Sequence, residues 1–174
     1  MSDVEVVDLE QYFEEFADST AMAEAAAFKT VPTGKYVAQI SKQTGQKWPD
    51  EDRPTVRVKA DLTNEGGVKV GSTFFNLAWI PKRNAEGKLD KPFQLWEQLT
   101  RALYPGEKAD DRSKKPVGQV LGDAMKYPIT LYLTESVQDQ SGKWSTPQDI
   151  EGVKAAREAG LKVTNFVQSI SKVD

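Results

Sequence analysis

Two tryptophans stand directly beside a lysine, in the pairs Lys47-Trp48 and Lys143-Trp144. A ring at the protein surface can stack on an unpaired nucleobase while a neighbouring cation binds the phosphate, and stacking contributes about 1–3 kcal/mol per base whatever the base is. Both pairs lie in polar segments that contain glycine or proline, where an indole has few apolar neighbours. These segments therefore predict stacking sites. The alternative is that each tryptophan folds back and covers the apolar interior.

The chain of 174 residues contains no cysteine and no histidine. This excludes disulfides, thiolate nucleophiles, histidine-ligated metals and catalysis by a serine–histidine–aspartate triad. The sequence also lacks a phosphate-binding glycine loop of the G-x-x-x-x-G-K-[ST] or G-x-G-x-x-G type. Asp50-Glu51-Asp52 carries the oxygen ligands that Mg²⁺ prefers, but adjacent acids in a proline-flanked segment are usually solvated. We expect no catalytic residue, no metal site and no cofactor.

A second set of cations and rings is placed by the alternation of predicted strands. In residues 55–62 every second residue is apolar, so that Arg57 and Lys59 face away from the interior. In residues 68–80 the more apolar parity is assigned inward, which leaves three residues outward: Phe74, Asn76 and Ala78. Tyr132 is outward by the same reasoning. Cations between exposed rings favour a surface for single-stranded nucleic acid. The alternatives are an ordinary solvated face, or a bulge at Gly71 that exchanges the parity.

Alternating hydrophobicity predicts the strands that position these residues, in five places: residues 35–40, 55–62, 68–80, 128–134 and 164–170. Apolar spacing predicts helices over 91–103 and 116–125, a Thr-Pro start predicts a helix between 146 and 160, and residues 107–115 are expected to be a surface loop. This order matches the OB-fold, a Greek-key barrel that binds oligonucleotides over strands 2–3 and the loops joining strands 1–2 and 4–5. We expect a mainly β protein with helices, a five-stranded OB-like barrel with a helical insertion between strands 3 and 4.

Charge is distributed unevenly along the chain. The formal net charge is −3, but residues 1–28 hold eight of the 26 acids and no base, so the first 28 residues carry −8 and residues 29–174 carry +5. Leu9, Tyr12, Phe13 and Phe16 follow a helical spacing. We therefore predict an acidic amphipathic helical arm over 1–28 and an OB-like nucleic-acid-binding domain over 29–174. The arm either docks on the domain through its aromatic stripe, or competes with an anionic ligand or recruits a partner.

A family resemblance begins at residues 30–38, which read Thr-Val-Pro-Thr-Gly-Lys-Tyr-Val-Ala. This Pro-x-Gly-x-Tyr start, preceded by an acidic aromatic segment and followed by two alternating strands and a glycine-rich turn, resembles a group of bacteriophage proteins. Those are small OB-fold-like, single-stranded-DNA-binding proteins encoded beside replication and recombination genes. The resemblance covers about residues 8–134 and carries no catalytic residue. The part after Tyr132, with its extra helix, departs from the pattern.

The sequence therefore predicts a non-enzymatic protein that binds single-stranded DNA in phage replication or recombination, without dependence on base sequence. Phosphates are assigned to four cations: Lys47, Arg57, Lys59 and Lys143. Bases are assigned to four rings: Trp48, Phe74, Tyr132 and Trp144. RNA as a ligand, a homo-oligomer, and a replication or recombination protein bound by the acidic arm are left open. The alternative is a phage virion or assembly protein that uses a small β-barrel and its exposed rings for protein–protein contacts.

The expected location is cytoplasmic, in the host bacterium if a phage encodes the chain. The N-terminus is acidic where a secretory signal needs positive charge, and no run of 18 apolar residues is present.

Overall fold

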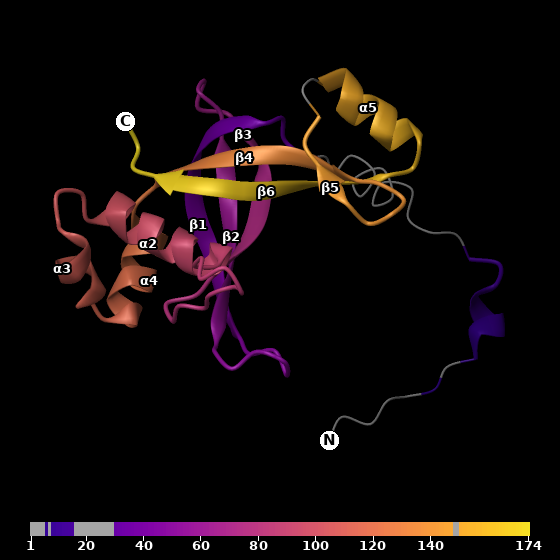
Figure 1. Ribbon diagram of the computed structural model, residues 1–174. Coiled ribbons are helices and arrows are strands. Elements are labelled where there is room, and N and C mark those ends of the chain that lie inside the picture. The colour runs from indigo at the N-terminus through magenta and orange to yellow at the C-terminus, as the bar shows by residue number, and fades with distance from the viewer. Residues whose placement is uncertain (1–5, 7, 16–29, 148–149) are drawn as a thin grey trace.

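A computed structural model describes residues 6, 8–15, 30–147 and 150–174 of the chain. Within them lie six antiparallel strands: β1 (Gly34–Gln46), β2 (Thr55–Thr63), β3 (Lys69–Leu77), β4 (Ile129–Gln138), β5 (Trp144–Ser145) and β6 (Lys162–Ser171). The helices are a short 3-10 helix η1 (Leu9–Tyr12) and α2 (Lys91–Leu103), α3 (Ala109–Ser113), α4 (Val117–Lys126) and α5 (Ile150–Glu158). The protein is therefore mainly β with helices, as predicted (Figure 1).

The sheet has the order β3-β2-β1-β4, and both β5 and β6 pair with β4. The long strand β1 joins the two parts, since Gly34–Ala38 pair with β4 and Val37–Gln46 pair with β2. The β1–β2 register shifts between Ile40 and Lys42, which is a β-bulge. In Figure 1, β1, β2 and β3 run across the direction of β4 and β6, so the sheet is strongly coiled.

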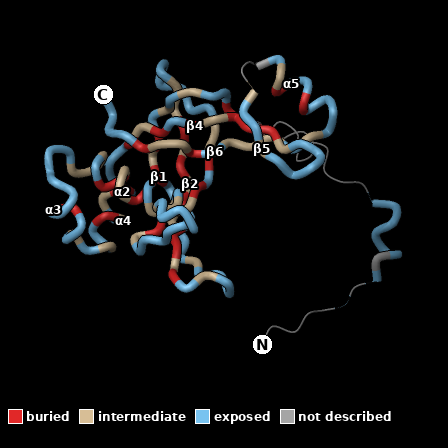
Figure 2. Tube along the Cα trace, in the orientation of Figure 1, coloured by how far each residue is buried: buried red, intermediate tan, exposed pale blue. Residues whose placement is uncertain are grey.

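The core lies on the concave side of this sheet, where the predicted inward parity is confirmed (Figure 2). On β2 it consists of four buried residues: Val56, Val58, Ala60 and Leu62. Phe75 and Leu77 of β3 are buried as predicted, but Ala78, predicted outward, is fully buried. Ala78 follows the last residue of β3 and donates its N–H to the Pro92 carbonyl (3.1 Å), which turns it out of the strand alternation and under α2.

The helical insertion between β3 and β4 forms as predicted and consists of α2, α3 and α4, which pack at one end of the sheet (Figure 1). Helix α2 begins next to Pro92, whose fixed φ suits the first helical turn, and it buries Trp96 and Leu99. The surface loop predicted over 107–115 is wrong, because these residues include α3 and a buried Arg112. The Arg112 guanidinium donates to the Glu97 carboxylate (3.1 Å) and to Thr100 Oγ1 (2.9 Å), which compensates the burial of its charge.

The predicted five-stranded OB-like barrel is not closed in the structure, because the sheet has six strands and stays open. Strands β3 and β6 are not paired with each other. Two segments hold them apart, one at each end. At one end, buried Val31 lies between Gly71 of β3 and Asn165 of β6. Its side chain packs closely on Gly71, since a Cβ added to this glycine would be 3.5 Å from Val31 Cγ1. Helix α2 bridges the other end, since the Gln98 amide oxygen accepts the Ile170 N–H (2.7 Å).

Of the predicted acidic helix, the described residues show one turn of 3-10 helix, η1. The Asp8 carboxylate accepts the N–H of Glu10 (3.0 Å) at its start, and both Tyr12 and Phe13 are exposed. Phe16 and residues 21–27 lie outside the described part of the chain. A search of the described helices for one long and apolar enough to cross a membrane finds none.

Candidate nucleic-acid interface

Three cations and one aromatic ring meet on the outer face of β1, β2 and β3. The strand register places Lys42, Lys59 and Phe74 in one row across the sheet, and Arg57 lies in the next row between Thr44 and Asn76. We call Lys42, Arg57, Lys59 and Phe74 the basic track. A hollow of about 140 Å³ lies on it and is lined by these four residues with Thr44 and Gln46. The structure therefore brings together the predicted residues Arg57, Lys59 and Phe74.

The electrostatic surroundings of the basic track favour an anion. Within the part of the chain that the structure describes, Lys42, Arg57 and Lys59 have no carboxylate within salt-bridge distance, whereas Lys69 at the far end of β3 pairs with Asp61 (3.7 Å). The Arg57 guanidinium carbon lies 4.8 Å from the centroid of the Phe74 ring, a cation–π contact that holds this half-exposed ring in place. Phosphate groups can thus approach these cations without displacing an existing ion pair.

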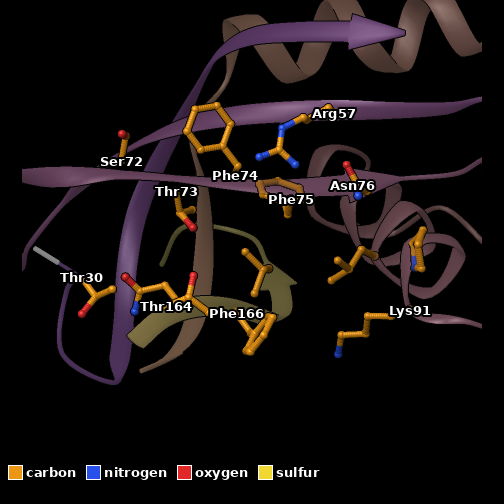
Figure 3. A pocket seen from close by; sticks show the side chains of 14 residues that line it. Thr30, Arg57, Ser72, Thr73, Phe74, Phe75, Asn76, Lys91, Thr164 and Phe166 are labelled. Atoms are coloured by element: carbon orange, nitrogen blue, oxygen red, sulfur yellow. The ribbon is translucent and has the colours of Figure 1, made fainter. Parts of the chain in front are cut away.

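A larger hollow of about 430 Å³ lies between residues 72–76 of β3 and residues 164–167 of β6, where the sheet is open (Figure 3). We call this gap the seam. Phe74 stands on one rim and Phe166 on the opposite rim, while Thr30 and Lys91 lie toward its two ends. Arg57 and Phe74 line both the seam and the hollow on the basic track, so the two hollows share one wall.

The two ends of the seam are fixed by hydrogen bonds. At one end the Val31 N–H donates to Asn165 Oδ1 (2.9 Å) and the Asn165 amide donates back to the Val31 carbonyl (2.8 Å). At the other end Lys91, at the start of α2, donates its ammonium group to the Gln168 carbonyl, and burial lowers the pKa of this lysine. The seam is therefore bounded at both ends rather than being a loose gap between two edge strands.

Trp144 lies beside the seam rather than in an open loop. Its ring is half-buried and meets the Phe166 ring edge to face, with the two centroids 5.0 Å apart. The ammonium nitrogen of Lys162 lies 6.0 Å from the centroid of the Trp144 ring. Lys143 is exposed in the β4–β5 turn. That turn is held by the Asp139 carboxylate, whose pKa is lowered by the Ser141 hydroxyl and by backbone N–H groups including that of Lys143. Trp144 thus follows the alternative of packing, and it supports Phe166.

Lys47 and Trp48 are exposed in the β1–β2 loop, one and two residues beyond Gln46 at the end of the track hollow. Trp48 keeps 54% of its surface exposed. The neighbouring Glu51 carboxylate forms ion pairs with Arg53 (3.5 Å) and Lys82 (3.4 Å). The described residues contain no group of three or more acidic side chains that could hold a metal ion. The loop therefore offers a free ring and a cation at one end of the track.

Tyr132 faces outward on β4 as predicted, but it lies in a different part of the sheet. It is opposite Lys35 of β1, seven residues before Lys42, and opposite Ser169 of β6. Figure 1 shows that the β1–β2 loop and the β4–β5 hairpin also project from different sides of the sheet. The eight predicted residues therefore do not form one cluster. Five of them follow the track and its loop, Trp144 adjoins the seam, and Tyr132 and Lys143 lie apart.

Three charged or aromatic residues of the two hollows were missed by sequence reasoning. Lys42 was missed because the first strand was predicted to end at residue 40, whereas β1 continues to Gln46. The bulge after Ile40 also exchanges the parity of β1, so that even-numbered residues face inward before it and outward after it. Phe166 could have been found, since its neighbour Val167 is an inward residue of the same strand. Lys91 carries no signal, because only the contact of α2 with β6 brings it to the seam.

Comparison of the chain with protein-family models, with curated proteins and with solved structures gives no match.

Proposed function

We propose that the protein is a non-enzymatic, sequence-tolerant single-stranded-DNA-binding protein that acts in phage DNA replication or recombination. One observation supports this most directly. The basic track places three cations without a carboxylate partner in the described residues around a half-exposed ring, on the face formed by β1, β2 and β3. A positively charged groove with rings on which bases stack is the usual design of a sequence-independent single-strand site.

In this proposal Lys42, Arg57 and Lys59 bind successive phosphates, and one base stacks on Phe74. Trp48 extends the stacking surface beyond the end of the track. Binding is driven in large part by release of the counterions that the phosphates hold, so affinity falls as salt rises. Base identity has little influence because every base presents a flat π face.

The proposed fold is an OB-like barrel with one open seam. A five-stranded OB barrel is often only partly open, with its ligand over strands 2–3. Here β1, β2, β3, β4 and β6 would be its five strands, and the missing contact is the pairing of β3 with β6. The helix between strands 3 and 4 corresponds to α2. The basic track then lies on the face that OB folds use for oligonucleotides.

The proposal is tested by the salt dependence of binding to oligo-dT. Lys59→Gln should reduce the slope of log affinity against log salt by about 0.7, the value for one phosphate on a single strand. The matched control is Lys114→Gln directly after α3, an exposed lysine paired with Asp110, which should leave the slope unchanged. Equal slopes for both variants and the wild type would argue that Lys59 meets no phosphate.

One observation favours the alternative of an assembly protein. Val70 is exposed near the start of β3, and Val68 is exposed just before it. Strand β3 is an edge strand, and exposed edge strands can pair with another chain. In that case sedimentation would show association that depends on protein concentration and is lost in a Val70→Lys variant, with no affinity for DNA.

A further inference from the structure

The seam contains polar side chains that the fold does not use. Four residues of its lining have no side-chain hydrogen bond within the described residues: Ser72, Thr73, Asn76 and Thr164. Two others in the same lining, Thr30 and Asn165, are engaged in bonds that fix the end of the seam. The Asn76 amide oxygen is buried without a partner, whereas buried polar groups normally find one. Together with the three free hydroxyls around a hollow of about 430 Å³, it points to a ligand.

The rims of the seam carry rings that are held in place. Phe74 is fixed by Arg57 on one rim (Figure 3). Phe166, on the other rim, is fixed by Trp144. Phe74 and Phe166 keep 44% and 38% of their surfaces exposed. A flat ligand that enters the seam therefore meets an ordered aromatic surface, without the cost of first immobilising a mobile side chain.

Charge decides which class of flat ligand fits. Arg57 and Lys91 belong to the lining, and no carboxylate does so among the described residues. A ligand with aromatic faces, hydrogen-bonding edges and a negative group is a nucleotide. Because Arg57 and Phe74 belong to both hollows, a strand bound on the basic track can turn one base into the seam without leaving the protein surface.

We propose that the seam between β3 and β6 is a pocket for a single unstacked nucleotide, with its base among the free polar groups of β3 and β6 and its phosphate at Arg57. This deepens the proposed function and rests on it, since the base belongs to the strand that the track binds. An extended peptide, which could instead pair with the free edge of β3, is the competing occupant that the experiment must distinguish.

The experiment follows backbone amide resonances of the ¹⁵N-labelled full chain during titration with dAMP, with deoxyribose 5-phosphate, and with oligo-dT. We expect dAMP to shift residues 72–76 and 164–167 together, and the sugar phosphate, which lacks the base, to leave residues 164–167 unchanged. Shifts from dAMP confined to residues 42–46 and 57–59, or equal shifts from dAMP and the sugar phosphate, would overturn the pocket.

Variants separate the pocket from the track. Phe166→Leu should weaken oligo-dT binding by roughly tenfold, the loss of one stacked base, and should abolish the dAMP shifts at residues 164–167. Tyr127→Leu is the matched control, since Tyr127 is an exposed ring after α4 outside both hollows. Equal affinities of the two variants would overturn the pocket. If dAMP occupies the seam but oligo-dT does not bind, the pocket stands and the proposed function fails.

Discussion

At the scale of single residues, the contact between Arg57 and Phe74 is central to the proposed site. The guanidinium lies 4.8 Å from the ring centroid, and the pair belongs to both the basic track and the seam. Arginine over an aromatic ring keeps its charge available to phosphate while it orients the ring for stacking. Both residues, with Lys59, were predicted from strand parity alone, because β2 alternates without interruption and its buried partners fix the parity of β3.

The first prediction concerns this ring. Phe74→Leu keeps an apolar side chain of similar burial but removes the stacking face, and we expect it to weaken oligo-dT binding by about 1–3 kcal/mol, or roughly 5- to 150-fold. Fluorescence anisotropy with a labelled oligonucleotide at low salt measures the change. Tyr127→Leu serves again as the control. A Phe74→Leu variant that binds as tightly as the control would remove Phe74 from the site.

At the scale of secondary-structure elements, the site is set by a bulge and by a helix. The bulge after Ile40 turns Lys42 onto the track, and α2 holds the end of β6 at a distance from β3. The second prediction tests the support of α2. Arg112→Met removes a buried guanidinium that bonds Glu97, Thr100 and Glu107, and it should lower the free energy of unfolding by about 1.5–3 kcal/mol in urea.

Arg101→Met is the matched control for this variant, because Arg101 pairs with the same Glu97 carboxylate (2.6 Å) but is exposed. An exposed pair contributes at most about 1 kcal/mol. Equal destabilisation by the two variants would contradict a special role for the buried arginine. Oligo-dT affinity should be unchanged in both, since neither arginine lines the seam or the hollow on the basic track.

How far the sequence predicts this fold depends on the range of the contacts. The alternation of 55–62 and 128–134 and the helix at 91–103 were predicted because local hydrophobic period decides them. The open seam was not predicted, because it depends on Val31 contacting Asn165, which is 134 residues away in the chain. The contact of Trp144 with Phe166 was not predicted for the same reason, since Phe166 lies on another strand.

At the scale of the whole molecule, charge is distributed unevenly along the chain. Residues 29–174 carry +5 and residues 1–28 carry −8. The third prediction is that deletion of residues 1–28 tightens oligo-dT binding, by about tenfold at low salt, because it removes eight negative charges that repel the strand. A full-length chain with these acids changed to Asn or Gln should behave in the same way, and the gain should shrink as salt rises. Weaker or unchanged binding by the folded truncation would count against a competing arm.

Intrinsic tryptophan fluorescence during an oligo-dT titration at low salt tests the central claim most directly. Trp79 and Trp96 pack together at the core, 6.1 Å between centroids, so a ligand-dependent change must come from exposed Trp48 or from Trp144 beside the seam. The account predicts saturable quenching that salt reverses and that Trp48→Phe largely removes. No affinity for oligo-dT at low salt, or an emission shift that follows protein concentration without DNA, would contradict it.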